Sequence, residues 1–280
     1  MLESDWTAGF SAERLRALLY FPAVVACFLA ILSLPLSLAY AQPAPATLRI
    51  AAAADLQPVL PPILDKFQQA TGVYAEATFQ ASAALTAQIQ NGAPFDLFLS
   101  ADLSYPKRLI DAGLAHSLSD SSKPVIYAKG TLVLWTRKDG RWSTPSLVTL
   151  SDPELRRLAI ANPERAPYGR AAVAVLASLK LADALKAKIV TAENVSQAAQ
   201  FAETGNADAG LISLTSARTA QLSSVGSYFI IPRDLYPPIE QGAAIVTKSS
   251  QHQNAQKFLE FLLSPAIQQQ LATSGLMPVK

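Results

Sequence analysis

Short apolar runs alternate with segments of helical spacing along most of this chain, and the alternation restricts it to an α/β sheet fold. The clearest run, Phe95 to Leu99, holds four apolar residues and follows the turn-forming Gly92 and Pro94. A strand of this kind is buried on both faces of its sheet. Ligands of such sheets bind where strands end and helices begin, so Asp96 and Asp102 raise the question of a site. Both aspartates also suit loops, which they stabilise through local hydrogen bonds.

The same patterns predict the order of the elements. We expect strands at 48–54, 95–99, 125–127, 132–135, 158–161, 209–214, 229–231 and 243–246. We expect helices at 60–71, 82–91, 105–112, 169–179, 195–203, 255–263 and 265–272, with Gly72, Gly92, Gly113 and Gly205 ending the first, second, third and fifth. This order favours two lobes joined by more than one crossing of the chain.

The composition excludes one broad class of function. The chain has 280 residues, of which 16% are charged, and a net charge of +2. Nucleic-acid-binding proteins carry a basic stripe with interleaved aromatic residues, and no such stripe is present. We therefore expect no nucleic-acid partner.

The N-terminus has the pattern of a secretory signal. Arg14 and Arg16 precede an uncharged stretch, 17–41, that ends in the small-x-small sequence Ala39-Tyr40-Ala41. We predict a signal peptide at 1–41, cleaved after Ala41, which removes the only cysteine and with it any internal disulfide. The stretch is also long enough for an uncleaved membrane anchor. Lipidation at Cys27 is a third alternative, although the apolar stretch continues well beyond that residue.

Sequence motifs of enzymes are missing. The chain has no GxSxG, Walker, GxGxxG or HExxH motif. Its two histidines, His116 and His252, have no local partner at metal-ligand spacing, so we expect both at the surface. We predict that the protein is not an enzyme. A hydrolase with a catalytic triad assembled from distant residues is the alternative from another class.

At three places the chain passes from an extended segment directly into a small residue at a helix start. These junctions are Ala53-Ala54-Asp55, Gln80-Ala81-Ser82 and Pro167-Tyr168-Gly169. Helix N-termini offer unpaired N–H groups and the positive end of the helix dipole, so several of them in one cleft would hold an oxyanion without lysine. Each junction alone is also typical of an ordinary helix cap.

Several ordered motifs resemble one family. The segment Gly92-Ala93-Pro94 through Asp102 is similar to the motif GAPxDLFxSAD, and 51–56, 162–172 and 193–198 match further motifs in order. From about Arg49 onward the chain resembles the periplasmic molybdate-binding proteins of ABC transporters. The resemblance implies a type II periplasmic binding protein fold, with lobe 1 formed by 42–128 and 235–280 and lobe 2 by 129–234.

The resemblance also implies the function. We expect a periplasmic monomer without a cofactor that captures molybdate between its lobes and delivers it to the membrane permease of an ABC importer. Tungstate has nearly the same charge and size and stays an alternative, and the smaller sulfate is a weaker one. A ferric site would need a cluster of tyrosines and carboxylates that these motifs do not supply.

Carried over residue by residue, the resemblance places the ligands of the anion. They fall on Asp55, Ser82, Tyr168 and, through its backbone, Val195; these residues would hold the molybdenum as its oxyanion. The surrounding or further candidates are Ala54, Arg170 and Ser213. One branch of the family has a tyrosine at the position of Ser213, and this chain resembles the branch with a tyrosine at 168.

Asp55 departs from the family pattern, which has a hydroxyl or amide there. A carboxylate about 4 Å from a dianion is repelled by several kcal/mol at an effective dielectric near 20. We therefore expect the Asp55 side chain to face away from the anion, either capping its own helix or pairing with Arg170. By the same resemblance, Asp96 and Asp102 belong to the framework of lobe 1 and do not touch the anion.

Overall fold

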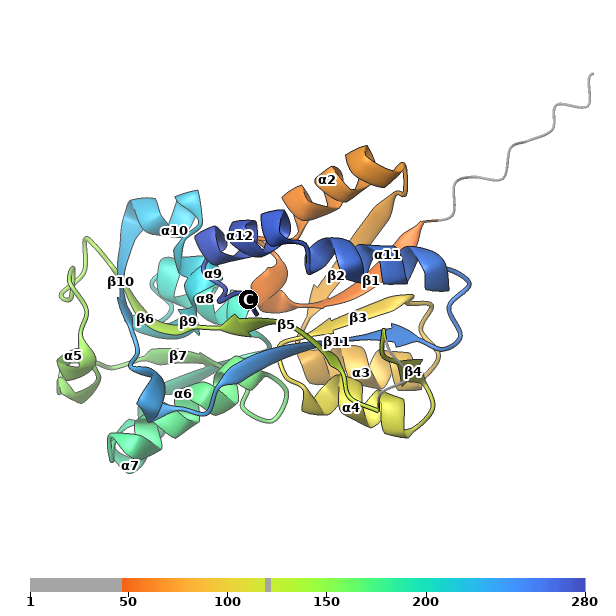
Figure 1. Cartoon of the computed structure of the whole chain (residues 1–280). Coiled ribbons are helices and arrows are strands. Elements are labelled where there is room, and N and C mark those ends of the chain that lie inside the picture. The colour runs from red at the N-terminus through yellow and green to blue at the C-terminus, as the bar shows by residue number, and fades with distance from the viewer. Residues whose placement is uncertain (1–46, 119–121, 280) are drawn as a thin grey trace, which may run out of the picture. The chain divides into compact units, whose positions relative to one another are not determined.

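Two β-sheets organise the chain in the computed structural model, which describes residues 47–118 and 122–279 (Figure 1). The first sheet has the order β2 (Ala75–Gln80), β1 (Leu48–Ala53), β3 (Leu97–Ser100), β11 (Ile239–Val246), β4 (Ala115–His116), and β5 (Val125–Gly130) also pairs with β11. The second has the order β10 (Gly226–Ile230), β6 (Leu132–Arg137), β9 (Ala209–Ser213), β7 (Leu158–Ala161), β8 (Ile189–Ala192). The chain passes between the sheets twice, from β5 to β6 and from β10 to β11. This is the mixed α/β, two-lobed architecture with two crossings that the sequence predicts.

Helices cover both sheets. They are α2 (Pro61–Thr71), α3 (Ser82–Gln90), α4 (Ser104–Asp111), α5 (Leu147–Ser151), α6 (Pro167–Ser178), α7 (Ala182–Leu185), α8 (Val195–Glu203), α9 (Leu214–Ala217), α10 (Ala220–Val225), α11 (His252–Leu262) and α12 (Pro265–Ser274). Three short 3-10 turns are η1 (Ala54–Leu56), η2 (Lys186–Lys188) and η3 (Arg233–Leu235). Among these described helices, none is long and apolar enough to cross a membrane.

The first sheet is buried on both faces because alternate residues of its strands serve two cores. Ile50 and Ala52 face the core formed with α2, α11 and α12, where Phe67 packs edge-on against Phe258 with ring centroids 5.0 Å apart. Ala51 faces the opposite core, formed with α3 and α4. Figure 1 shows α2, α11 and α12 on one side of this sheet and α3 and α4 on the other.

The second sheet packs against helices rich in alanine. Helices α6 and α8 bury several alanines against its strands, and Trp135 of β6 is fully buried in the same core. Gly169, in the first turn of α6, makes the closest approach, because a Cβ atom there would overlap the carbonyl of Ala161 in β7. The absence of a side chain at 169 therefore lets the N-terminus of α6 lie directly on the end of β7.

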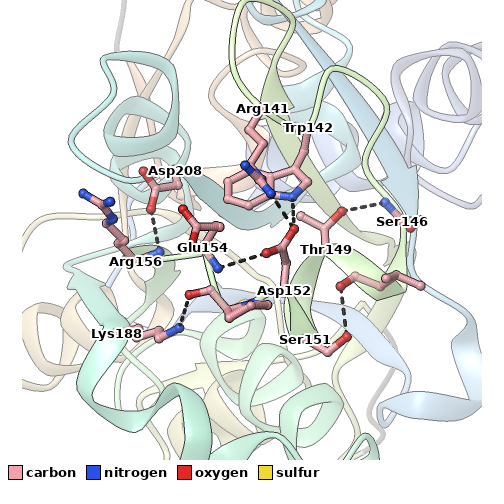
Figure 2. Close-up of polar contacts among 12 residues, drawn as sticks. Arg141, Trp142, Ser146, Thr149, Ser151, Asp152, Glu154, Arg156, Lys188 and Asp208 are labelled. Carbon is pink, nitrogen blue, oxygen red and sulfur yellow. Dashed lines mark hydrogen bonds and ion pairs between the residues drawn. The ribbon is translucent and has the colours of Figure 1, made fainter.

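Polar contacts fix the loops at the far end of the second sheet (Figure 2). Asp152 accepts hydrogen bonds from Trp142 Nε1 and the Glu154 N–H, both at 2.9 Å, and the tryptophan bond is the main reason that the pKa of this carboxyl is lowered. Asp208 accepts from the Arg156 N–H at 2.8 Å. These contacts hold the start of β7, the strand that leads to α6.

Most predicted elements are confirmed, with ends shifted by a few residues. The predicted helix ends at Gly72, Gly92, Gly113 and Gly205 are confirmed, since each of these glycines has a positive φ. The predicted list lacked β2 and β8, which are partly exposed edge strands with weak apolar patterns. It also lacked the two-residue strand β4 and the short helices α5, α7, α9 and α10. β3 begins at Leu97, not at Phe95, because Asp96 lies in the preceding turn, where it accepts a hydrogen bond from the Arg49 N–H at 2.7 Å. The predicted signal peptide at 1–41 and Cys27 lie outside the described residues.

Candidate functional site

Four chain segments meet at one cavity between the two sheets. The segments are the turn η1 after β1 and the N-termini of α3, α6 and α8, and Ala101 of the loop after β3 completes the lining. The lining residues are Ala53, Ala54, Asp55, Gln80, Ala81, Ser82, Ala101, Ala166, Pro167, Tyr168, Asn194 and Val195. All three junctions singled out in the sequence contribute, and Asn194 and Val195 add a fourth. Among these lining residues none is lysine or arginine, so the groups that could attract an anion are helix N–H groups, helix dipoles and hydroxyls.

Asp55 lines this cavity and is fully buried. Its Oδ2 accepts hydrogen bonds from Tyr168, at 3.1 Å, and from the side-chain amide of Gln241. Its Oδ1 is buried with no hydrogen-bond partner in the described part of the chain. Burial raises the pKa of the Asp55 carboxyl to about 6, although the bonds from Gln241 and Tyr168 act in the opposite direction.

Both expectations for the Asp55 side chain are wrong. The turn η1 has Ala53 at its N-cap position and no side-chain cap, so Asp55 does not cap its own helix. Arg170 instead donates to Asp102 at 2.6 Å and to the Tyr105 hydroxyl at 3.0 Å. The Asp55 carboxylate instead accepts from Tyr168 and Gln241, and neither donor is near it in sequence.

Tyr168 presents a buried hydroxyl from the first turn of α6. Burial, and next the negative charge of Asp55, raise the pKa of this hydroxyl well above its usual value, so it stays protonated and acts as a donor. Gly130, at the end of β5, leaves the space that the hydroxyl occupies, because a Cβ atom at 130 would overlap the Tyr168 oxygen. The single proton of this hydroxyl is directed at Asp55.

Ser82 is the first residue of α3, and its side chain does not cap the helix. Its Oγ accepts a hydrogen bond from the Ala101 N–H at 3.2 Å, which leaves the hydroxyl proton available to another acceptor. Val195 likewise begins α8, directly after Asn194, whose side chain caps the helix by accepting from the Gln197 N–H. Ser82 and Val195 thus lie where helix N–H groups lack intrahelical partners.

Of the three further candidates, only Ala54 lines the cavity. Ala54 lines the cavity, and its carbonyl accepts a hydrogen bond from Ser196 of α8 at 2.8 Å. Arg170 and Ser213 are not among the lining residues. Arg170 belongs to a bridge between α6 and the loop after β3, and Ser213 caps α9 by accepting from the Ser216 N–H.

Direct contacts join the segments of the first sheet to those of the second around the cavity. The Ala83 N–H of α3 donates to the Arg165 carbonyl at 3.2 Å, and Thr215 donates to the Asp55 carbonyl at 2.8 Å. Asp102 was expected to belong to the framework of lobe 1. Its ion pair with Arg170 also joins lobe 1 to lobe 2.

Sequence reasoning missed Gln241, which donates to Asp55 from β11. A weak signal was present, because Gln241 directly precedes the apolar run Gly242 to Val246 of β11 and is fully buried with it. The side-chain oxygen of Gln241 is buried without a partner among the described residues.

Metal chemistry has no support at this cavity. No group of three or more histidine, cysteine, aspartate or glutamate side chains in residues 47–118 and 122–279 is placed to hold a metal ion. The arrangement suits an anion instead, because helix N–H groups and hydroxyls are donors.

Known proteins with similar sequences include proteins named for binding an oxyanion. The family model described as bacterial extracellular solute-binding protein matches residues 48–276. The chain is 38% identical to the molybdate-binding protein ModA of Azotobacter vinelandii over 220 residues, which cover 79% of this chain and 85% of that protein. It is also 38% identical to ModA of Rhodobacter capsulatus over 199 residues, 71% of this chain and 75% of that protein.

A solved structure agrees with the sequence relatives. The periplasmic molybdate-binding protein of Azotobacter vinelandii superposes on this chain with a TM-score of 0.77 and 31% sequence identity. The match covers 83% of this chain and 100% of that protein. The matched region contains every segment that lines the cavity. The chain belongs to the family of bacterial extracellular solute-binding proteins.

Proposed function

We propose that this protein is a periplasmic receptor that captures molybdate between its two lobes and delivers it to the membrane permease of an ABC importer. The observation that carries the proposal is the meeting of η1 and the N-termini of α3, α6 and α8 at one cavity without a cationic side chain. The similarity to proteins named as molybdate-binding supports this ligand. Tungstate is the second candidate, because hydrogen-bond donors do not readily separate two tetrahedral dianions of nearly equal size.

The proposed ligands are Ser82, Tyr168 and the backbone at Ala54, Asp55 and Val195. Burying a dianion is costly unless donors surround it. About six charge-assisted hydrogen bonds, at roughly 1.5 to 3 kcal/mol each, are of the size needed to offset this cost. Because the donors are neutral, opening of the lobes would release the anion to the permease. We propose a monomeric, non-enzymatic receptor with lobes at 42–128 plus 235–280 and 129–234.

Opening of the lobes is also required for binding. The free volume accessible to a water molecule in the cavity is about 10 Å³, which is room for about one water. A tetrahedral oxyanion is larger, so contacts such as Ala83 to Arg165 and Tyr168 to Asp55 must lengthen or rearrange to admit it. The two connections between the sheets, β5 to β6 and β10 to β11, are the natural hinges.

The buried carboxyl of Asp55 adds a protonation step to anion binding. An ionised carboxylate would repel a dianion, and it also holds the only proton of the Tyr168 hydroxyl. We propose that one proton from solvent binds Asp55 when the anion binds. The neutral carboxyl then donates to the Tyr168 oxygen, and the Tyr168 O–H turns to donate to the anion.

The first prediction concerns ligand choice. Calorimetric titration should show one molybdate bound per chain, tungstate bound with similar affinity, and sulfate bound more weakly. Ligand at one hundred times its dissociation constant should add about 2.7 kcal/mol to the free energy of unfolding. Absence of binding by both molybdate and tungstate, with turnover of generic ester substrates, would replace the receptor by the hydrolase alternative.

The second prediction concerns Ser82. Ser82→Ala removes one charge-assisted bond to the anion and should weaken molybdate binding by roughly 1.5 to 3 kcal/mol. The free energy of unfolding without ligand should fall by only about 1 kcal/mol, because the bond from the Ala101 N–H is also lost. The matched control is Ser264→Ala at the start of α12, away from the cavity. Equal molybdate affinity in the Ser82 and Ser264 variants would remove Ser82 from the site.

The third prediction concerns pH. Because the pKa of Asp55 in the ligand-free protein is about 6, the carboxyl is ionised above that pH and anion binding must then take up a proton. Molybdate affinity should therefore be nearly constant below pH 6 and should fall as the pH rises, approaching about tenfold per unit. Asp55→Asn should abolish this slope, whereas Asp65→Asn on the exposed face of α2 should keep it. A pH-independent affinity between pH 6.5 and 8.5 in the parent protein would contradict the protonation step while leaving the receptor function intact.

A further inference from the structure

The two histidines of the chain face each other where helix α11 begins beside strand β4 of the first sheet, outside the cavity described above. His116 ends β4 and His252 begins α11, and these residues are 136 positions apart in the sequence. The distance from His116 Nε2 to His252 Nδ1 is 3.3 Å. Neither residue lines the anion cavity.

The hydrogen bonds of the other two ring nitrogens, His116 Nδ1 and His252 Nε2, fix the protonation of the nitrogens that face each other. His116 Nδ1 contacts the Ser117 carbonyl at 3.1 Å, and His252 Nε2 contacts the Thr247 carbonyl at 3.0 Å. A carbonyl oxygen only accepts, so both of these nitrogens must carry the proton of a neutral ring. The two nitrogens that face each other therefore both present lone pairs, which repel unless a cation lies between them.

The spacing also suits a bridging metal ion. The two ring nitrogens are 3.3 Å apart. Two bonds of about 2.05 Å from imidazoles to a tetrahedral zinc ion place their nitrogens about 3.3 Å apart.

We propose that His116 Nε2 and His252 Nδ1 together bind a divalent transition-metal ion of the class that prefers imidazole, such as Zn²⁺. The rings are held before the ion binds, because His116 pairs with Ile245 of β11 and the Thr247 N–H donates to the Leu114 carbonyl. Both side chains are partly exposed, so an ion reaches them from solvent. Water completes the coordination, since no third histidine, cysteine or carboxylate joins the pair within the described ranges.

The test uses the untagged protein without molybdate, because a histidine tag would bind the same ion. Calorimetric titration with Zn²⁺ should show one ion bound per chain. Long-range ¹H–¹⁵N spectra contain only two histidines, and Zn²⁺ should shift His116 Nε2 and His252 Nδ1. Removing a residue that hydrogen-bonds a metal-binding histidine already lowers metal affinity about 10- to 100-fold. Replacing the histidine itself, in His116→Gln or His252→Gln, should therefore weaken Zn²⁺ binding at least about tenfold.

Gln253→Ala, on the exposed side of the same helix, is the matched control and should bind Zn²⁺ as the parent does. Molybdate binding should be unchanged in all three variants, which separates this site from the anion site. The spectra of the parent protein decide the question even if a variant does not fold. Zn²⁺ binding that shifts neither histidine, or a proton shared between the two rings with no Zn²⁺ bound, would overturn the proposal.

Discussion

The hydrogen bond from Tyr168 to Asp55 joins the two lobes through two buried side chains. Asp55 comes from the turn after β1 and Tyr168 from the start of α6, and both are almost completely buried. An ionised carboxyl with one unpartnered oxygen is costly in such a place, and burial accordingly raises its pKa to about 6. The contact is therefore sensitive to the charge in the cavity, because protonation of Asp55 changes which of the two groups donates.

The neutral donors of the cavity follow from how the chain makes its turns. Three strands run into three helices whose first residues are small or apolar, so backbone N–H groups face the cavity and no lysine or arginine lines it. Gly169 and Gly130 allow this close packing, one by letting α6 lie on β7 and the other by leaving room for the tyrosine hydroxyl. A receptor built this way would bind a dianion through many moderate interactions that are lost together when the lobes separate.

Much of this architecture could be predicted from the sequence, because strand and helix patterns are local. The segments Leu158–Ala161 and Val195–Glu203 were placed with their observed bounds, and the strand-to-helix junctions at Asp55, Ser82 and Tyr168 meet as expected. The orientation of Asp55 could not be predicted, because its partners Tyr168 and Gln241 are 113 and 186 positions away. The sequence suggested only a helix cap or a pair with Arg170, and Arg170 is bound to Asp102 instead. The weakly apolar edge strands β2 and β8 were missed for a related reason, since they are stabilised by a neighbouring strand more than by their own burial.

The central claim is that an oxyanion lies where η1 and the helices α3, α6 and α8 meet. Anomalous diffraction at the molybdenum absorption edge, from crystals grown with molybdate, locates the metal atom without reference to any assumed site. The account predicts one anomalous peak per chain, inside the cavity lined by Asp55, Ser82, Tyr168 and Val195, with the Tyr168 hydroxyl turned from Asp55 toward the anion. A peak elsewhere in the molecule, or a peak in the cavity with the Tyr168 hydroxyl still bonded only to Asp55, would contradict it.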